Sequence, residues 1–423
     1  MNCKRNLMLT IGVLIISMYG YAQDTLRITL PQAEKQFLEH NLYLLAEKYN
    51  ISKAQAEVVQ MKLFPNPNLK LEGSVYNPNN NRFADIGNTS GQYAIAAEQL
   101  ILLAGKRNKQ VKLARTASSM AEDRFFDLLR TLSFTLRSNF YKAHYQQNTL
   151  AALQQQISTL ETLQTTYHGL QAKGIVSGKD AVRVTSLLYN LRAEHTSLLN
   201  ECHDMQSELQ LLLHRQNTWY VTEVTAEPVS LRRTDLQTLL DTALLTRQDL
   251  RLAQHALQYS EQNYRLQKAM AVPDLTVGAM FDKRSNYIDN ASLLNVAMDL
   301  PFFHRNQGNI KAARVDIAQQ KLLLEQQAAV VENEVRTVYA QALNTEKAVF
   351  AIDPGFRLQL EILLQNMGEH LLKKEVSLLE FTDFYDSYKE NILRLNNMQN
   401  DRMQAIEKLN YVIGKNLLNN EAN

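Results

Sequence analysis

The chain has 423 residues with 45 basic and 43 acidic side chains, which gives a formal net charge of only +2 at pH 7. No block rich in lysine or arginine marks a nucleic-acid surface, so we expect no nucleic-acid partner. No apolar stretch in the body of the chain reaches the roughly 20 residues of a membrane helix, so any membrane crossing must be made by strands.

Residues 1–22 have the pattern of a secretory signal peptide. Lys4 and Arg5 precede an apolar run over residues 7–19, and the small residues Gly20 and Ala22 follow it. The run is shorter than a spanning helix requires, which argues against a membrane anchor. We therefore expect cleavage after Ala22 and export from the cytoplasm.

The two cysteines limit the covalent chemistry of the chain. Cys3 lies before the apolar run rather than at its end, so we expect no lipid anchor. Cleavage would leave Cys202 alone, which excludes an intramolecular disulfide and a cysteine-rich metal scaffold. Stability must then come from packing.

Glycine and proline are absent from six long windows, and we predict that these windows are helical. Apolar residues recur within them at spacings of three and four, as in the stripe Val184, Leu187, Leu191, His195, Leu198, Cys202, Met205 and Leu209. This pattern is typical of helices that pack side by side. The windows are residues 32–64, 106–168, 179–227, 229–272, 309–353 and 369–413.

Two of these windows carry further information about helix length. Residues 106–168 would extend about 95 Å as one straight helix, which suits a wall or a bridge better than a compact core. The window 309–353 ends at Asp353, Pro354 and Gly355, where proline removes a backbone donor. We predict a break in the helix there.

Between the first and second windows the period changes to two. Leu69, Leu71 and Val75 alternate with polar residues, and a second amphipathic stretch covers residues 92–100 after the polar linker 77–90. The same layout returns at residues 275–281 and 293–300. We predict two hairpins, with strands of about the 9 to 11 residues that cross a bilayer when tilted.

Aromatic residues lie near the ends of these strands. They admit two interpretations, an interfacial aromatic belt or contacts between neighbouring strands. The residues are Tyr76, Tyr93, Phe281 and Tyr287.

The two halves of the chain share their spacing, which predicts a tandem duplication. Pro67 and Pro273 are 206 residues apart, and Ser177 and Ser377 are 200 apart. The first repeat is residues 23–218, with a strand hairpin at 68–100 and a long helix pair at 105–214. Residues 219–234 are the connector. The second repeat is residues 235–423, with a strand hairpin at 274–300 and a long helix pair at 308–414.

Four membrane-crossing strands cannot close a barrel alone, because an open edge leaves unpaired backbone groups in lipid. About eight strands make the smallest closed barrel, so at least two copies are needed, and three copies would give twelve strands.

These features resemble the TolC family of outer-membrane factors over essentially the whole mature chain. The segment 300–310 is similar to the Leu-Pro-x-Phe-x-Arg-Asn-Gln-Gly pattern of the heavy-metal efflux branch, the CzcC- and CusC-like proteins, where it leads from the last strand into a long helix. The matching residues are Pro301, Phe303, Arg305, Asn306, Gln307 and Gly308. The first repeat has Ala104, Gly105, Lys106 and Arg107 where the family has Gly-Gly-Lys-Arg.

The resemblance also assigns the turns between the long helices. Residues Gly174, Ile175, Val176 and Ser177 match the family turn at the periplasmic tip, which meets an adaptor protein and a pump. In the second repeat Val376 and Ser377 match, but Lys374 stands in place of the glycine.

Two acidic residues follow the second turn. Glu380 and Asp383 fall where some family members place acidic rings that narrow the inner aperture. In a threefold assembly each would form a ring of three carboxylates, which attract cations and raise one another's pKa by repulsion. The alternative is a solvated acidic turn on a surface helix.

The resemblance implies a mainly α fold with a membrane β-barrel. A homotrimer would place twelve strands in outer-membrane lipid and long α-helical hairpins in a periplasmic tunnel. Its partners would be a periplasmic adaptor (membrane fusion) protein and an inner-membrane RND pump for heavy-metal cations. It implies passive passage, with no enzyme activity and no cofactor. The alternatives are a duct for drugs or secreted proteins, and an exported coiled-coil scaffold that forms no channel.

A few residues suggest metal binding. His195 and Cys202 lie on the apolar stripe, with His203 beside them, so core packing is the simpler interpretation. His304 lies in the turn motif, where we expect a surface imidazole. We assign no metal site and no catalytic residue, since no nucleophile, base and orienting group can be recognised together.

Overall fold

The computed structural model describes residues 24–87, 90–224, 230–231, 234–285 and 288–416. The predicted signal peptide, Tyr287 and part of the predicted connector lie outside the described residues. The chain forms two compact units. The helical unit contains residues 1–45, 128–247 and 331–423, and the strand unit contains residues 46–127 and 248–330.

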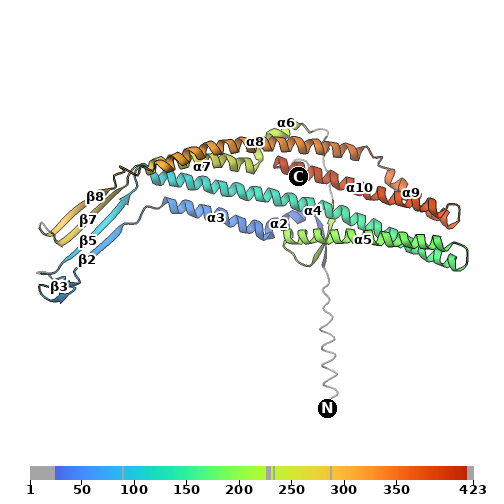
Figure 1. Ribbon diagram of the computed structural model, residues 1–423, viewed down its shortest axis with the longest axis horizontal. Helices are drawn as coiled ribbons and strands as arrows, with labels where there is room; N and C mark the ends of the chain where they lie inside the picture. The colour runs from blue at the N-terminus through green and yellow to red at the C-terminus, as the bar shows by residue number, and fades with distance from the viewer. Residues whose placement is uncertain (1–23, 88–89, 225–229, 232–233, 286–287, 417–423) are drawn as a thin grey trace, which may run out of the picture. The chain divides into compact units, whose positions relative to one another are not determined.

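The strand unit holds a four-stranded antiparallel sheet with the order β2-β5-β7-β8 (Figure 1). Its strands are β2 (Asn68–Gly73), β5 (Tyr93–Ile101), β7 (Leu275–Arg284) and β8 (Asp289–Met298). The helices with residues in this unit are α3 (Leu42–Lys62), α4 (Lys106–Ala172), α7 (Gln248–Met270) and α8 (Gln307–Phe350). The central pairing of β5 with β7 joins the two predicted repeats in one sheet.

The register of the sheet places apolar side chains of all four strands on one face. Leu71 pairs with Ile95, and Ile95 pairs with Phe281. One step along, Leu69, Ala97, Ala279 and Leu294 form a row. The opposite face carries polar residues such as Lys70, Glu98 and Asn295. Because side chains alternate along a strand, this alignment gives the sheet one mainly apolar face and one mixed face, on which Ala96, Met280 and Leu293 continue the row of Lys70.

The strand lengths agree with the sequence pattern in three cases out of four. β5, β7 and β8 have 9, 10 and 10 residues, but β2 has only 6. The polar linker also contains a short hairpin that the sequence did not predict, β3 (Tyr76–Asn77) with β4 (Arg82–Phe83). Asp85 organises this loop by accepting hydrogen bonds from Asn77, Asn80 and Ser90, which lower the pKa of its carboxyl.

The aromatic residues near the strand ends make contacts with one another. The rings of Tyr93 and Phe281 lie 6.0 Å apart across β5 and β7, and those of Tyr76 and Phe83 lie 5.0 Å apart. These distances fit the second interpretation of these residues, contacts between neighbouring strands.

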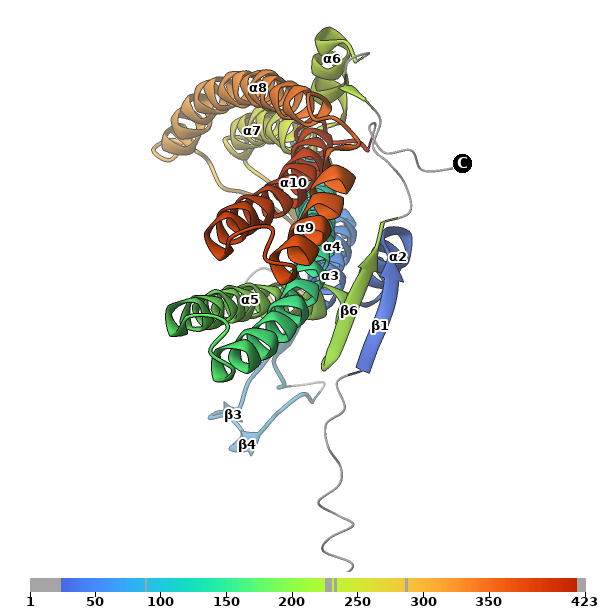
Figure 2. The ribbon, with the colours of Figure 1, turned by 90° about the vertical axis from the view of Figure 1, so that its right-hand side faces the viewer.

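The helical unit contains two helical hairpins and a small parallel sheet. The sheet pairs β1 (Asp24–Thr29) with β6 (Thr218–Glu223), which lie side by side next to α2 in Figure 2. The remaining helices are α2 (Leu30–His40), α5 (Gly178–Leu213), α6 (Leu236–Thr246), α9 (Phe356–Leu372) and α10 (Leu378–Ile413). No helix among the described residues combines the length and the apolar character needed to cross a membrane.

Four of the predicted helical windows are wrong at one point each, and one of them is the window 369–413, which the turn at residues 373–377 divides between α9 and α10. The window 32–64 is divided at Asn41, and the window 229–272 is divided at Arg247. The window 179–227 runs past the end of α5, because His214 adopts a left-handed conformation and β6 follows. The predicted break after 309–353 is confirmed, since α8 ends at Phe350 and α9 begins at Phe356.

A side-chain cap marks the break at Asn41, and a contact with a distant helix end marks the break at Arg247. The Asn41 side-chain oxygen accepts a hydrogen bond from the Leu44 N–H at 2.9 Å, while its amide donates to the Leu212 carbonyl at 3.0 Å. Arg247, 206 residues later, donates to the Val412 carbonyl at 3.4 Å. Both side chains are buried against the C-terminal end of a long helix.

Candidate functional site

The two turns between the long helices share their backbone conformation. Gly174 has a φ of +68°, and Lys374, at the position without the expected glycine, has a φ of +61°. The Ile175 N–H donates to the Leu170 carbonyl and the Glu375 N–H to the His370 carbonyl, each at 2.9 Å. Lys374 therefore keeps the helix-ending turn in a conformation that glycine adopts more easily.

Each turn ends in a serine that caps the next helix. Ser177 accepts a hydrogen bond from the Asp180 N–H, and Ser377 accepts one from the Glu380 N–H. Ile175 is exposed at the first turn, while Val176 and Val376 are half-buried. The first turn thus presents an exposed apolar side chain next to a capped helix start.

Glu380 uses its carboxylate within its own helix. The carboxylate accepts hydrogen bonds from the Ser377 N–H at 2.9 Å and from the Ser377 hydroxyl at 2.8 Å, which completes a capping box. These hydrogen bonds lower the pKa of the Glu380 carboxyl. Asp383 lies one turn further along α10 and is exposed. The matching positions of the first hairpin hold Asp180 and Arg183.

The second turn also contains a hydrogen bond between His370 Nδ1 and Glu375 Oε2. The hydrogen bond from His370 lowers the pKa of the Glu375 carboxyl. The first turn has Leu170 and Ile175 at these positions. The two tips therefore share their backbone but differ in charge.

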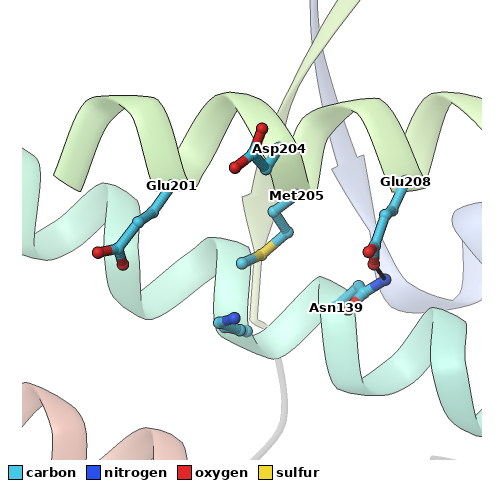
Figure 3. A pocket seen from close by; sticks show the side chains of 6 residues that line it. Asn139, Glu201, Asp204, Met205 and Glu208 are labelled. Atoms are coloured by element: carbon cyan, nitrogen blue, oxygen red, sulfur yellow. Dashed lines mark hydrogen bonds between the residues drawn. The ribbon is translucent and has the colours of Figure 1, made fainter. Parts of the chain in front are cut away.

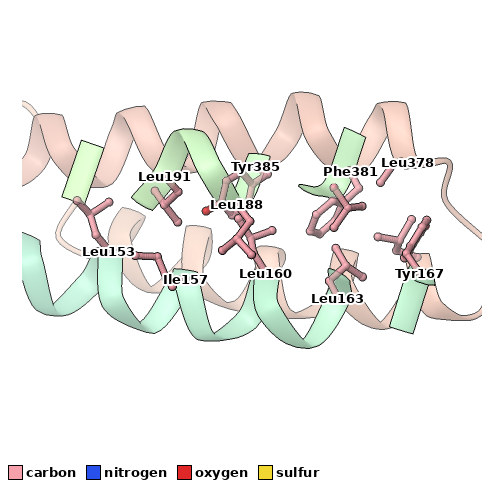
Figure 4. Packing of buried hydrophobic residues seen from close by; sticks show 12 residues of the cluster. Leu153, Ile157, Leu160, Leu163, Tyr167, Leu188, Leu191, Leu378, Phe381 and Tyr385 are labelled. Carbon is pink, nitrogen blue, oxygen red and sulfur yellow. The ribbon is translucent and has the colours of Figure 1, made fainter. Parts of the chain in front are cut away.

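A shared apolar core supports the two hairpins. Side chains of α4, α5 and α10 point toward one another in Figure 4, and α9 contributes Leu371. The cluster consists of Leu153, Ile157, Leu160, Leu163, Tyr167, Val184, Leu188, Leu191, Leu371, Leu378, Phe381 and Tyr385. Polar contacts add orientation: Tyr385 donates to Gln156 at 3.0 Å, and Lys389 pairs with Glu194 at 2.9 Å.

The turn motif after β8 is built around Asn306. This residue has a φ of +57°, is buried, and donates through its amide to the Gln267 carbonyl at 2.8 Å. Gln307 accepts from the Arg305 N–H at 2.8 Å and donates to the Phe303 carbonyl at 3.3 Å. Asn and Gln therefore fold the turn into the start of α8, where Gly308 has open space around it.

The remaining motif residues face outward. Pro301 is half-buried, whereas Phe303 and Arg305 are exposed. In the corresponding segment of the first repeat, Ala104 and Gly105 both have positive φ, and Lys106 pairs with Asp274 at 2.8 Å.

The four side chains that suggested metal binding have different surroundings in the structure. Cys202 is fully buried, as its place on the apolar stripe predicts, and burial raises the pKa of its thiol to about 11. His195 is half-buried, His203 packs on the Trp219 ring, and His304 is exposed. Within the described ranges, no group of three or more His, Cys, Asp or Glu side chains has an arrangement that could hold a metal ion.

Two hollows in the surface were not predicted from the sequence. One, of about 250 Å³, lies between α4 and α5 and is lined by Asn139, Lys142, Glu201, Asp204, Met205 and Glu208 (Figure 3). Its wall is fixed by a hydrogen bond of 2.7 Å from Asn139 to Glu208. The other, of about 220 Å³, lies on the sheet next to Gly278.

The sheet is open at both edges in the single chain. β2 and β8 each have one neighbouring strand. The apolar face is exposed at Leu69, Leu71, Ile95, Leu294 and Val296. A monomer in water would leave this face uncovered, which is costly for an apolar area of this extent.

Comparison with family models gives a match to part of the chain. Residues 239–351 match the model of the family described as outer membrane efflux protein. The sequence matches none of the curated proteins with which it was compared.

Several solved structures share the fold over almost the whole chain. CusC aligns with a TM-score of 0.73 at 18% identity, covering 91% of this chain and 92% of its own. The CmeC outer membrane channel of Campylobacter jejuni aligns with a TM-score of 0.75 at 13% identity, covering 93% and 87%. The open state of the MtrE outer membrane channel of Neisseria gonorrhoeae aligns with a TM-score of 0.70 at 17% identity, covering 92% and 89%.

Proposed function

We propose that three copies of this chain form the outer-membrane channel of a tripartite efflux system. Their twelve strands close a β-barrel in lipid, and their helical hairpins form a tunnel through the periplasm. The observation that carries the proposal is the open sheet with one mainly apolar face and one face on which the charged and amide side chains lie. Sister copies would pair its free edges, lipid would cover the apolar face, and water would fill the interior.

The family match at residues 239–351 and the shared fold of CusC, CmeC and MtrE support this proposal. CmeC and MtrE are outer membrane channels. Function as a passive duct follows from the proposed architecture, since a water-filled bore needs no chemistry of its own.

Cross-linking between the free edges tests the assembly. Each chain carries one cysteine on β2 and one on β8, for example Leu71→Cys with Val296→Cys. Cys202→Ser removes the native thiol. Oxidation of outer membranes should give covalent species up to a trimer and none larger. A variant with both cysteines on the inner strands β5 and β7 is the matched control, and should give no link between copies. A soluble periplasmic monomer would refute the proposal and favour the exported coiled-coil scaffold.

The tip turns are the proposed docking points for a periplasmic adaptor and an inner-membrane RND pump. Ile175 is exposed there and the helix ends are fixed by Ser177 and Ser377, so a partner meets a preformed surface. Glu380 and Asp383 are proposed as acidic rings at the inner aperture, because both are exposed in the first turns of α10 beside that tip. Repulsion within a ring would oppose the lowering of the Glu380 pKa by Ser377.

Heavy-metal cations are the proposed cargo, on the strength of the turn motif at residues 300–310 and the likeness to CusC. The second candidate is a duct for drugs or secreted proteins, which the same fold also fits. Deletion of the gene followed by tolerance tests separates them. Sensitivity to copper, zinc, cobalt or nickel supports the first candidate, and sensitivity to dyes and antibiotics alone supports the second.

A further inference from the structure

The segment between β2 and β5 carries three large apolar side chains that the chain itself does not cover. Val75 is 78% exposed, Phe83 is 77% exposed and Ile86 is 71% exposed. They lie in the β3–β4 hairpin or directly beside it. Apolar side chains gathered in one short segment and left in contact with water indicate a surface that meets a partner.

This segment has a fixed conformation. The Asp85 carboxylate is the centre of its polar contacts, and Lys283 of β7 donates from Nζ to the carbonyls of Ile86 and Gly87. The backbone is also tightly packed, since a Cβ atom at Gly91 would lie 2.4 Å from the carbonyl carbon of Ile86. A partner would therefore meet a preformed surface, which lowers the entropy that binding costs.

The position of the hairpin in the sheet indicates which partner this is. Three successive antiparallel pairings join β2 to β8, so the end of β2 and the start of β8 lie at the same end of the sheet. Figure 1 shows the β3–β4 hairpin beyond the end of β2, on the side of the sheet away from β8. In the proposed ring of copies, β8 of the next copy meets β2 at this edge. The hairpin would then reach the start of that β8.

The start of β8 complements the hairpin in apolar character and in charge. Ile288 is 66% exposed, and Asp289 beside it is exposed. On the hairpin, Arg82 is exposed next to Phe83. Within the described part of the chain, neither the Arg82 guanidinium nor the Asp289 carboxylate has a hydrogen-bond or ion-pair partner. An apolar contact with opposite charges beside it is the usual composition of a specific protein interface.

We propose that the β3–β4 hairpin of each copy packs on the start of β8 of the next copy. The apolar side chains at positions 75, 83 and 86 cover Ile288, and Arg82 pairs with Asp289. This inference rests on the proposed function, because it requires a closed ring of copies. The contact lies beyond the paired strands, so it can be absent while the ring is present.

A cysteine pair tests the contact in the full mature protein. Phe83→Cys and Ile288→Cys are combined with Cys202→Ser. Within one chain the two edges of the sheet are about 14 Å apart, while a disulfide requires Cα atoms within about 7 Å, so any link joins two copies. Oxidation of outer membranes should give covalent species up to a trimer. Phe83→Cys with Leu294→Cys is the matched control and should give none, because residue 294 lies about 20 Å further along β8.

The strand pair Leu71→Cys with Val296→Cys, measured in parallel, separates this inference from the proposed function. A link between these strands without one between positions 83 and 288 would overturn the hairpin contact and leave the ring of copies intact. Absence of both links would mean that the copies form no ring, and the proposed function would fail with it.

An exchange of charges tests the ion pair. Arg82→Asp and Asp289→Arg each place like charges together, so each should lower the temperature at which the trimer dissociates in detergent by a few degrees. The double variant restores the attraction with the charges reversed and should recover most of this shift. A double variant that dissociates as early as the single variants would overturn the proposed contact.

Discussion

At the scale of single residues, the second tip turn shows that a lysine can take the place of a glycine. Lys374 adopts a positive φ close to that of Gly174, so the duplicated turn keeps its hydrogen bonds despite the change of residue. A left-handed conformation costs a residue with a Cβ atom about 1 kcal/mol. The two positions therefore form a matched pair for measuring that cost.

We expect Lys374→Gly to stabilise the protein by up to about 1 kcal/mol, and Gly174→Ala to destabilise it by about the same amount. A Cβ atom at Gly174 would meet nothing within 4 Å, so the second effect comes from the backbone conformation alone. Thermal unfolding of the detergent-solubilised protein measures both. An increased melting temperature for Gly174→Ala would contradict this explanation.

The acidic residues near the tip make a second prediction at this scale. Asp383→Asn should reduce the preference of the channel for cations, because each change removes three charges from the proposed ring. Glu380→Gln should act in the same direction while keeping an oxygen for the Ser377 hydrogen bonds. Single-channel currents in planar bilayers provide the measurement. Arg183→Gln, at the matching position of the first hairpin, is the control for a changed exposed charge.

Unchanged currents and unchanged ion preference in both acidic variants would exclude Glu380 and Asp383 from the aperture. The two residues would then form a solvated acidic turn, which was the alternative from the sequence.

At the scale of helices, polar caps determine where several elements begin and end. Asn41 divides two helices in a segment without glycine or proline, and Ser377 with Glu380 fixes the start of α10. Each cap satisfies backbone N–H groups that a helix start leaves without partners. Local sequence composition does not reveal which polar residue takes this role.

Replacement of the Asn41 cap should destabilise the helical unit. Asn41→Ala removes the cap of α3 and leaves the half-buried Leu212 carbonyl without this donor, so we expect a loss of about 2 kcal/mol. Asn41→Ser keeps a capping oxygen and should recover about half of the loss. Urea unfolding of the solubilised protein measures the difference. Equal stability of the two variants would show that capping contributes nothing here.

The start of α10 should depend on pH through Glu380. Its pKa is lower in the folded protein than the usual 4.5, so its stabilising effect is present above about pH 4.5 and is lost as the pH falls through the folded pKa. Hydrogen exchange in the first turn of α10 should therefore accelerate, relative to the intrinsic rate, under acidic conditions. Glu380→Gln should remove this pH dependence, and its persistence in that variant would assign it to another group.

At the scale of the whole molecule, the two faces of the sheet determine what the chain must contact. The apolar rows on one face continue through four strands from both predicted repeats. A lysine on a lipid-facing strand position costs about 2–4 kcal/mol at the middle of a bilayer. Neighbouring positions of one strand therefore respond differently to the same change.

We expect Leu294→Lys to reduce the yield of heat-resistant trimer in the outer membrane strongly, because it places a charge on the apolar face. Asn295→Lys lies on the polar face and should assemble almost normally. Gel electrophoresis of unheated and heated membranes measures both. Equal yields for the two variants would mean that the apolar face does not meet lipid.

The sequence by itself determined the kinds of elements and the composition of their faces. Periodicity of three and four marked the long helices, alternation marked the strands, and Pro354 marked the break between α8 and α9. These signals are local, because they depend only on neighbouring residues. The sequence also predicted Cys202 as a core residue from its place on the apolar stripe.

The tertiary structure decided what depends on residues far apart in the chain. The β1–β6 pair joins segments nearly 200 residues apart, and the side chains of Asn41 and Arg247, at two helix breaks, donate to carbonyls at distant helix ends. The coincidence of the apolar faces likewise requires the register between β5 and β7. A one-residue slip in that register would have reversed the faces, which is why alternation alone could not establish it.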